Sequence, residues 1–176
     1  IRRYGIDQNR IYVMPFEPSR KFNNKNYEIN KLKNYLEFKP YLFYPAQYWS
    51  HKNHVYIIEA IKYLEDKIDL NIKAIFTGYD KGNLSYLKNY AKKLLIEKKV
   101  FFMNFLTDEE IYFLYRNCLA VVMPTYFGPT NIPPLEAFEH KVPLIYSDLP
   151  GMREQVKDAA LFVNLEDPLS LAKAVK

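Results

Sequence analysis

Residues 119–138 have the sequence LAVVMPTYFGPTNIPPLEAF, which passes from an apolar run through a proline-rich loop into a helix. The run Leu119–Met123 carries no charge, as expected of a strand that is covered on both faces of a sheet. In the loop, Gly128 lets the backbone approach a ligand closely, and the prolines stiffen the turn and preset the first helical residues. The segment from Gly128 to Glu136 therefore predicts a loop that runs into a helix at the working edge of the domain.

The same alternation of strand, loop and helix continues along the chain from Pro40 onward. The other short apolar runs are Tyr41–Ala46, Ile72–Phe76, Val100–Met103, Pro143–Tyr146 and Ala160–Val163. Repeated β-α units imply parallel strands joined by right-handed crossovers. The sequence therefore predicts an α/β fold, a doubly wound, Rossmann-like parallel sheet with helices on both faces.

Helical patterns lie between these runs. Apolar residues recur at helical spacing over residues 55–64 and again over residues 84–94. Thr107 and Glu110 have the spacing of a capping box, which predicts a helix over Asp108–Arg116. Asp167 followed by Pro168 marks another helix start, because proline at the first helical position gives up a donor that is unpaired anyway.

The first forty residues have a different pattern. Arg10–Met14 is a candidate strand, and Pro15–Asn26 is a polar loop with two prolines. A helix is expected over Glu28–Phe38, with four apolar or aromatic residues on one side: Ile29, Leu32, Tyr35 and Leu36. The chain opens without an initiator Met and closes within a helical pattern, so we interpret it as part of a larger protein.

The composition bounds the class of protein. A chain of 176 residues, 49% of them hydrophobic, is long enough for one sizeable core and too short for two ordinary domains. The formal charge of +5 comes from lysines spread along the chain, which does not favour nucleic acid as a partner. No long uncharged apolar run or signal pattern is present, and we expect a cytoplasmic protein.

The single cysteine and the three histidines do not predict a reactive or metal site. Cys118 excludes a disulfide framework and, among apolar neighbours, is interpreted as a small core residue rather than a nucleophile. His51 and His54 lie close together, but His140 is far away and no acidic cluster accompanies them, so we expect no metal ligands. Neither a Walker loop nor a G-x-G-x-x-G fingerprint occurs.

Two of the loops that follow apolar runs carry candidate ligand-binding residues. Lys52 comes directly before a helix, where a cation opposes the helix dipole; an anionic ligand would reverse that penalty, although an exposed lysine is the more frequent explanation. Glu136 in the first turn of a helix either stabilises the helix start or accepts hydrogen bonds from ribose hydroxyls. Free amides at the same helix start suit a phosphate. Together these features describe a nucleotide.

Several separated motifs, in order, give the chain a wider resemblance. These are Tyr44-Pro45-Ala46-Gln47 through His51-Lys52-Asn53, Ile75-Phe76-Thr77-Gly78, Phe105 to Ile111, Phe127 to Phe138, Ser147 to Gly151 with Glu154, and Asp158 to Val163. With them, residues from about Tyr41 to the end resemble the C-terminal, donor-binding domain of retaining glycosyltransferases of the two-domain GT-B architecture. That family, glycosyl transferases group 1 or family 4, includes bacterial mannosyl- and glucosyltransferases of surface polysaccharides.

The resemblance implies a retaining hexosyltransferase that moves a sugar from a nucleotide-diphospho-sugar to a glycan or lipid-linked acceptor. Lys52 would pair with the diphosphate and Glu136 would hold the ribose, which makes these two the candidate catalytic residues. The backbone of Thr130, Asn131 and Ile132 would face the phosphates or donor sugar, with Gly128 and Gln47 beside them, and main chain near Phe105 and Leu106 would meet the base. No metal or other cofactor is implied.

The resemblance also divides the chain. Residues 1–39 would be the tail of a missing N-terminal domain with a linker and first helix, and residues 40–176 would be the nucleotide-sugar-binding domain, truncated in its last helix. The acceptor would bind the missing domain, so this piece alone is expected to be inactive. The full-length protein is expected in the cytoplasm, with peripheral association at the inner face of the membrane as one expectation.

The chain departs from the family pattern in two places. Gln47 stands where the family usually has an arginine, which removes one fixed positive charge. The family signature places two glutamates eight positions apart, but the position eight residues before Glu136 is Gly128. With two additional residues in the loop, Tyr126 takes the place of the first glutamate. These departures keep two alternatives open: a non-catalytic nucleotide-binding or interaction module on this fold, and a nucleotide-sugar epimerase.

Overall fold

A six-stranded, entirely parallel sheet lies at the centre of the computed structural model, which describes residues 3–12, 14, 17, 32–128 and 131–176. The strand order is β3-β2-β1-β4-β5-β6. The strands are β1 (Tyr41–Pro45), β2 (Lys73–Thr77), β3 (Val100–Met103), β4 (Ala120–Met123), β5 (Leu144–Ser147) and β6 (Leu161–Val163). All six predicted strands are confirmed, and so is the doubly wound fold.

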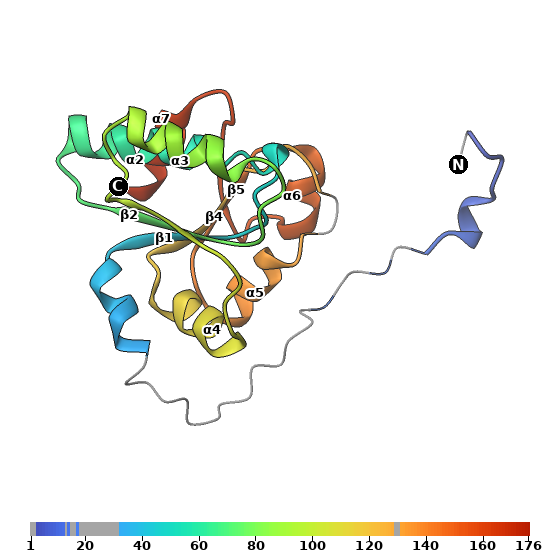
Figure 1. Cartoon of the computed structure of the whole chain (residues 1–176). Coiled ribbons are helices and arrows are strands. Elements are labelled where there is room, and N and C mark those ends of the chain that lie inside the picture. Colours follow the sequence, from blue (N-terminus) through green and yellow to red (C-terminus); the bar gives the residue numbers. More distant parts are fainter. Residues whose placement is uncertain (1–2, 13, 15–16, 18–31, 129–130) are drawn as a thin grey trace.

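Helices cover both faces of this sheet, as predicted (Figure 1). On one face lie α2 (His54–Tyr63), α3 (Leu84–Lys93) and α7 (Pro168–Val175), with α7 packed against α2. On the other face lie α4 (Asp108–Asn117) and α5 (Pro133–Glu139). The short helix α6 (Pro150–Val156) lies towards the end of the sheet formed by β5 and β6. A π-helical turn, Leu64–Ile68, extends α2.

Local sequence explains where these helices begin. The capping box of α4 is present in both directions, since Thr107 accepts from the backbone of Glu110 and the Glu110 side chain accepts from the backbone of Thr107. Asp167 caps α7 by accepting from the amide of Leu169, directly before Pro168. Both predicted helix starts are confirmed.

The core lies on both sides of the central strands. Every residue of β4 and β5, and all of β1 except its last residue, is buried. Burial on both faces is why these strands are continuous apolar runs without alternation. At roughly 25 cal/mol for each Å² of apolar surface, this burial is the main stabilisation of the domain.

The sheet order creates a crevice between two neighbouring strands. β1 leads into α2 on one face, whereas the adjacent β4 leads into α5 on the other face. The loops that follow these two strands therefore diverge at the carboxyl edge of the sheet. In doubly wound folds such a switch point is where ligands bind.

The predicted strand over Arg10–Met14 is wrong. Arg10 ends a 3-10 helix, Gln8–Arg10, and Ile11, Tyr12 and Met14 are exposed outside any strand. None of the described residues in this segment pairs with a strand of the six-stranded sheet, so its backbone groups make no ladder hydrogen bonds there.

The predicted helix over Glu28–Phe38 is confirmed only as a shorter and tighter element. Residues 28–31 lie outside the described residues, and Lys33–Phe38 forms a 3-10 helix. Side chains three apart align in such a helix. Tyr35 and Phe38 accordingly pack against the domain, through Phe113 and Phe101, whereas Leu36 is exposed.

Candidate functional site

Two adjacent hollows open at the carboxyl end of β1, and both are lined by Pro45, Ala46 and Gln47. The first, here called the Lys52 hollow, has a volume of about 320 Å³ and is also lined by Trp49, His51, Lys52, Met123, Asn131, Ile132 and Pro133. The second, the Glu136 hollow, has a volume of about 240 Å³ and is also lined by Thr77, Gly78, Tyr79, Asn104, Phe105, Leu106, Ile111 and Glu136. Residues predicted from distant loops thus meet at one edge.

Lys52 presents a partly buried positive charge to the first hollow. It ends a 3-10 helix, Ser50–Lys52, directly before α2, and its backbone carbonyl accepts a hydrogen bond of 3.0 Å from the Tyr44 hydroxyl. Its Nζ donates to Asn131 Oδ1 at 3.2 Å. Burial lowers the pKa of the Lys52 ammonium. No ion pair within the described part of the chain includes this lysine, so its partner there is a neutral amide.

Hydrogen bonds fix the orientation of Asn131. Its Nδ2 donates to the Gly128 carbonyl and the Tyr146 hydroxyl, both at 2.7 Å, which leaves Oδ1 facing Lys52. Gln155 on α6 donates to the Asn131 carbonyl at 2.6 Å and accepts from the Tyr146 hydroxyl at 3.0 Å. Tyr146 and Gln155 could not be predicted from the sequence, because neither belongs to a local motif of the loop.

Gly128 is required by this arrangement. Its φ is +139°, a conformation that other residues rarely adopt, and a Cβ there would lie 2.7 Å from Asn131 Oδ1. The predicted role of Gly128, a close backbone approach in the loop, therefore has a defined neighbour in Asn131.

The expectation of free amides at the start of α5 needs correction. The first two helical residues, Pro133 and Pro134, have no N–H, and the amides of Leu135 and Glu136 already donate to the Ile132 carbonyl. The first turn of α5 therefore offers no free backbone amide to a ligand, and any amide donors must come from the residues before the helix. Asn131 and Ile132 line the Lys52 hollow and carry backbone amides, whereas Thr130 lies outside the described residues.

Glu136 lies on α5, is buried, and is one of the residues that line the second hollow. Its Oε2 accepts a hydrogen bond of 2.6 Å from the hydroxyl of Tyr115 on α4. A glutamate that only stabilises a helix start is normally exposed, so burial beside a hollow favours the ligand-binding interpretation. Sequence analysis missed Tyr115, whose contact with Glu136 joins two helices.

The loops after β2 and β3 form the outer wall of the Glu136 hollow. Phe105 is largely exposed and its ring stacks with that of Tyr79, with the centroids 5.9 Å apart. Leu106 is partly buried beside it. Gly78 lets this wall approach β1, since a Cβ there would lie 2.5 Å from the Ala46 carbonyl oxygen. An open aromatic surface of this kind is suited to stacking with a planar base.

The two positions that depart from the family pattern are both exposed. Gln47 accepts a hydrogen bond of 3.0 Å from Nε1 of Trp49 and lines both hollows. Tyr126 is 54% exposed and donates its amide to the carbonyl of His51, 3.0 Å away. Neither side chain carries a charge to the crevice.

Histidine and cysteine are not arranged for metal binding or nucleophilic chemistry. His54 is enclosed by the rings of Tyr44, Tyr48 and Phe76, and burial lowers its pKa to about 3. Burial raises the pKa of the Cys118 thiol to about 12, so the thiol stays protonated. In the described ranges, no group of three or more His, Cys, Asp or Glu residues could hold a metal ion.

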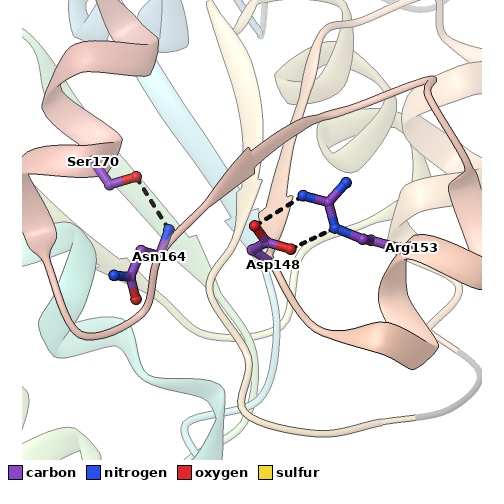
Figure 2. A network of polar contacts seen from close by, with 4 residues as sticks. All are labelled: Asp148, Arg153, Asn164 and Ser170. Carbon is purple, nitrogen blue, oxygen red and sulfur yellow. Dashed lines mark hydrogen bonds and ion pairs between the residues drawn. The ribbon is translucent and has the colours of Figure 1, made fainter.

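One further strong charge at the carboxyl edge is already neutralised. Arg153 on α6 forms an ion pair with both carboxylate oxygens of Asp148, and its guanidinium lies over the ring of Phe162, 4.2 Å from the centroid. Figure 2 shows this pair beside a second contact, from the Asn164 amide to the Ser170 hydroxyl. The first contact ties the loop after β5 to α6, and the second ties the loop after β6 to α7.

The family of the chain follows from comparison with known proteins. Residues 27–176 match the family model described as glycosyl transferases group 1. The chain belongs to this family. Within the described residues, every helix is too short or too polar to span a membrane.

Two of the relatives that the chain resembles are O-antigen chain mannosyltransferases. The chain is 29% identical to the O-antigen chain mannosyltransferase RfbU of Salmonella typhimurium strain LT2, over 99% of this chain and 46% of that protein. It is 24% identical to O-antigen chain mannosyltransferase B of Escherichia coli, over 75% of this chain and 35% of that protein. The chain thus spans less than half the length of these two curated relatives.

Solved structures confirm the architecture. A crystal structure of Anabaena HepE in complex with UDP-glucose superposes with a TM-score of 0.74 at 19% identity, over 92% of this chain and 45% of that one. WaaG, a glycosyltransferase involved in lipopolysaccharide biosynthesis, gives a TM-score of 0.69 at 22% identity, over 90% of this chain and 44% of that one. At these identities the likeness establishes the fold, that of one GT-B domain.

Proposed function

We propose that this chain is the donor-binding part of a retaining glycosyltransferase that transfers a hexose from a nucleotide-diphospho-sugar during surface polysaccharide synthesis. One observation carries the proposal. Two adjacent hollows at the switch point of the sheet present a lysine ammonium and a glutamate carboxylate that do not neutralise each other.

The chemistry of a nucleotide-diphospho-sugar fits this pair of hollows. Its diphosphate needs cationic and N–H donors, which Lys52 and the amides of Asn131 and Ile132 offer in the first hollow. Its ribose hydroxyls need an acceptor, which Glu136 offers in the second. Its base needs a planar apolar surface, which Phe105 offers at the outer wall.

Transfer requires stabilisation of the leaving group. The bond between the anomeric carbon and the diphosphate oxygen breaks, and the diphosphate keeps the electron pair. An acceptor hydroxyl oxygen forms the new bond, and its proton passes to the departing diphosphate oxygen. A fixed ammonium beside the diphosphate stabilises the charge that grows on it. We propose that Lys52 and the loop amides perform this role without a metal ion, and that the acceptor is a glycan or a lipid-linked glycan bound by another part of the full protein.

A thermal-shift panel tests donor binding. UDP-, GDP-, ADP- and dTDP-sugars are each added to the full-length protein, and donor hydrolysis is followed in parallel with and without EDTA. The proposal expects one nucleotide series to raise the melting temperature, with a turnover that EDTA leaves unchanged. If none of the four series stabilises the protein, the chain is instead a module that kept the fold and lost the donor.

The stereochemistry has its own test. With the full-length protein and a glycan acceptor, the one-bond carbon–proton coupling at the new anomeric centre distinguishes the two configurations by NMR. The proposal expects the configuration of the donor to be kept. An inverted product would remove the retaining assignment and leave donor binding intact.

A further inference from the structure

The Glu136 carboxylate is held from behind by one tyrosine. The hydroxyl of Tyr115 donates to Glu136 Oε2 at 2.6 Å, and the tyrosine ring is completely buried. The ring meets Phe43 of β1 edge-on with the centroids 5.0 Å apart, and it lies 4.9 Å from the ring of His140. A ring fixed between two others places its hydroxyl, and hence the carboxylate oxygen that accepts from it, at one position.

This contact leaves one glutamate oxygen for a ligand. Glu136 lines the hollow. Among the described side chains, only Tyr115 donates a hydrogen bond to its carboxylate, and the accepting oxygen is Oε2. Since a carboxylate has two oxygens with about four acceptor sites, Oε1 can accept from a ligand while Oε2 stays with the tyrosine. An unrestrained glutamate would lose rotamer freedom on binding, and the tyrosine removes that cost beforehand.

We infer that Tyr115 is the positioning residue that sets the ribose specificity of the site, by orienting Glu136 towards the vicinal hydroxyls of a nucleoside diphosphate. The tyrosine itself lies behind the glutamate and touches no ligand. The inference rests on the proposed function and adds to it a selection for ribose over 2′-deoxyribose.

The chain offers a matched control for the tyrosine hydroxyl. Tyr41 is equally buried, and its hydroxyl donates to the Leu114 carbonyl at 3.0 Å. Tyr41 starts β1, so it lies at the end of the strand opposite to the hollows. Tyr41→Phe and Tyr115→Phe therefore each remove one buried tyrosine hydroxyl bond, and only the second bond touches Glu136.

Calorimetry with UDP, 2′-deoxy-UDP, GDP and 2′-deoxy-GDP tests the inference. Loss of one hydrogen bond to a charged group costs roughly tenfold in affinity, so the wild-type protein and Tyr41→Phe should each prefer the ribonucleotide by about that factor. Tyr115→Phe should reduce the preference to about threefold or less, with the affinity for the deoxynucleotide nearly unchanged.

The calorimetry distinguishes failure of the Tyr115 role from failure of nucleotide binding. If Tyr115→Phe keeps the wild-type preference, or if the wild-type protein has none, the positioning role is overturned while nucleotide binding stands. If the wild-type protein binds none of these four nucleotides and neither ADP nor dTDP, the proposed function fails and the inference fails with it.

A measurement on the wild-type protein covers the case in which Tyr115→Phe does not fold. The tyrosine rings are labelled with ¹³C and the NMR signals are followed on saturation with each nucleotide. The Tyr115 resonance should shift more with the ribonucleotide than with its deoxy analogue, because only the ribonucleotide has the 2′-hydroxyl that can donate to Glu136. The Tyr41 resonance should shift with neither. Equal Tyr115 shifts for the two nucleotides would overturn the inference.

Discussion

The Lys52 hollow and the Glu136 hollow share the end of β1 yet hold their charges in different ways. Lys52 is partly buried, its partner is the neutral Oδ1 of Asn131, and burial lowers the pKa of its ammonium. Glu136 is buried more deeply, and a tyrosine hydroxyl at 2.6 Å holds one of its oxygens. Lys52 is therefore a charge that an anion would stabilise, whereas Glu136 is a charge already oriented for a second hydrogen bond.

Because the two charges are held apart, one crevice can bind a ligand that has both an anionic diphosphate and hydroxyl donors. Two opposite charges in direct contact would form an ion pair and bind little else. Here a strand end, Pro45 to Gln47, lies between them and belongs to both hollows. Each charge then meets its own part of the ligand, and the distance between the two functions is fixed by the sheet.

The largest expected effect is the loss of the Lys52 charge. Lys52→Ala should weaken nucleoside-diphosphate binding by about 2–3 kcal/mol and pyrophosphate binding by a similar amount, because a charged hydrogen bond is lost from a partly buried site. Calorimetry measures both ligands. Lys62→Ala is the control, since Lys62 pairs with Asp66 on the surface of α2. Equal affinities in the wild-type protein and Lys52→Ala would break the comparison.

Replacing the carboxylate of Glu136 should have a smaller effect with a different profile. Glu136→Gln is expected to weaken nucleoside-diphosphate binding by about 1–2 kcal/mol and to leave pyrophosphate binding unchanged, because only the ribose meets this side chain. The same calorimetric series measures it, with Glu139→Gln, an exposed position on the same helix, as the control. A weakened pyrophosphate affinity would show that the two hollows do not divide the ligand as proposed.

Removing the support of Asn131 should cost less again. Gln155→Ala deletes the donor to the Asn131 carbonyl and the acceptor of the Tyr146 hydroxyl, so the loop that faces Lys52 loses its bond to α6. We expect nucleoside-diphosphate affinity to fall by about 1 kcal/mol, the usual net worth of such bonds. Arg153→Ala on the same helix removes a surface ion pair with Asp148 and a contact with the Phe162 ring, neither of which involves Asn131, and should leave the affinity as it is. Similar losses in both variants would point to a general effect of α6.

The smallest expected effect is a gain. Gln47→Arg places a guanidinium at the boundary of the two hollows, where the family usually has one, and should strengthen nucleoside-diphosphate binding by about 0.5–1 kcal/mol at low salt. Titration at two salt concentrations shows whether the gain is electrostatic, since screening should reduce it. Unchanged or weaker binding would mean that the diphosphate does not reach Gln47.

Local patterns sufficed for the sheet and for the loops that carry the site. Strands covered on both faces leave continuous apolar runs such as Leu119–Met123, and caps such as Thr107 with Glu110 act within one helical turn. The position of Lys52 and Glu136 at the same edge followed from the rule that parallel strands place their loops together.

The partners of these residues were beyond sequence reasoning. Asn131 is 79 positions from Lys52 and Tyr115 is 21 positions from Glu136, so each contact depends on how separate elements pack. Pro133 and Pro134 predict the start of α5 correctly. For the site, the more important consequence is that neither proline has an N–H that could bind a phosphate. A period of 3.6 predicts Leu36 on the buried side, but Lys33–Phe38 forms a 3-10 helix and Leu36 is exposed.

The decisive measurement is a crystal structure of the protein with the nucleoside diphosphate that the thermal-shift panel selects. The account predicts a diphosphate oxygen at about 2.7–3.2 Å from Lys52 Nζ, a ribose hydroxyl at hydrogen-bond distance from Glu136 Oε1, and the base beside Phe105. A nucleotide bound with its diphosphate in the Glu136 hollow, or away from both hollows, would contradict it.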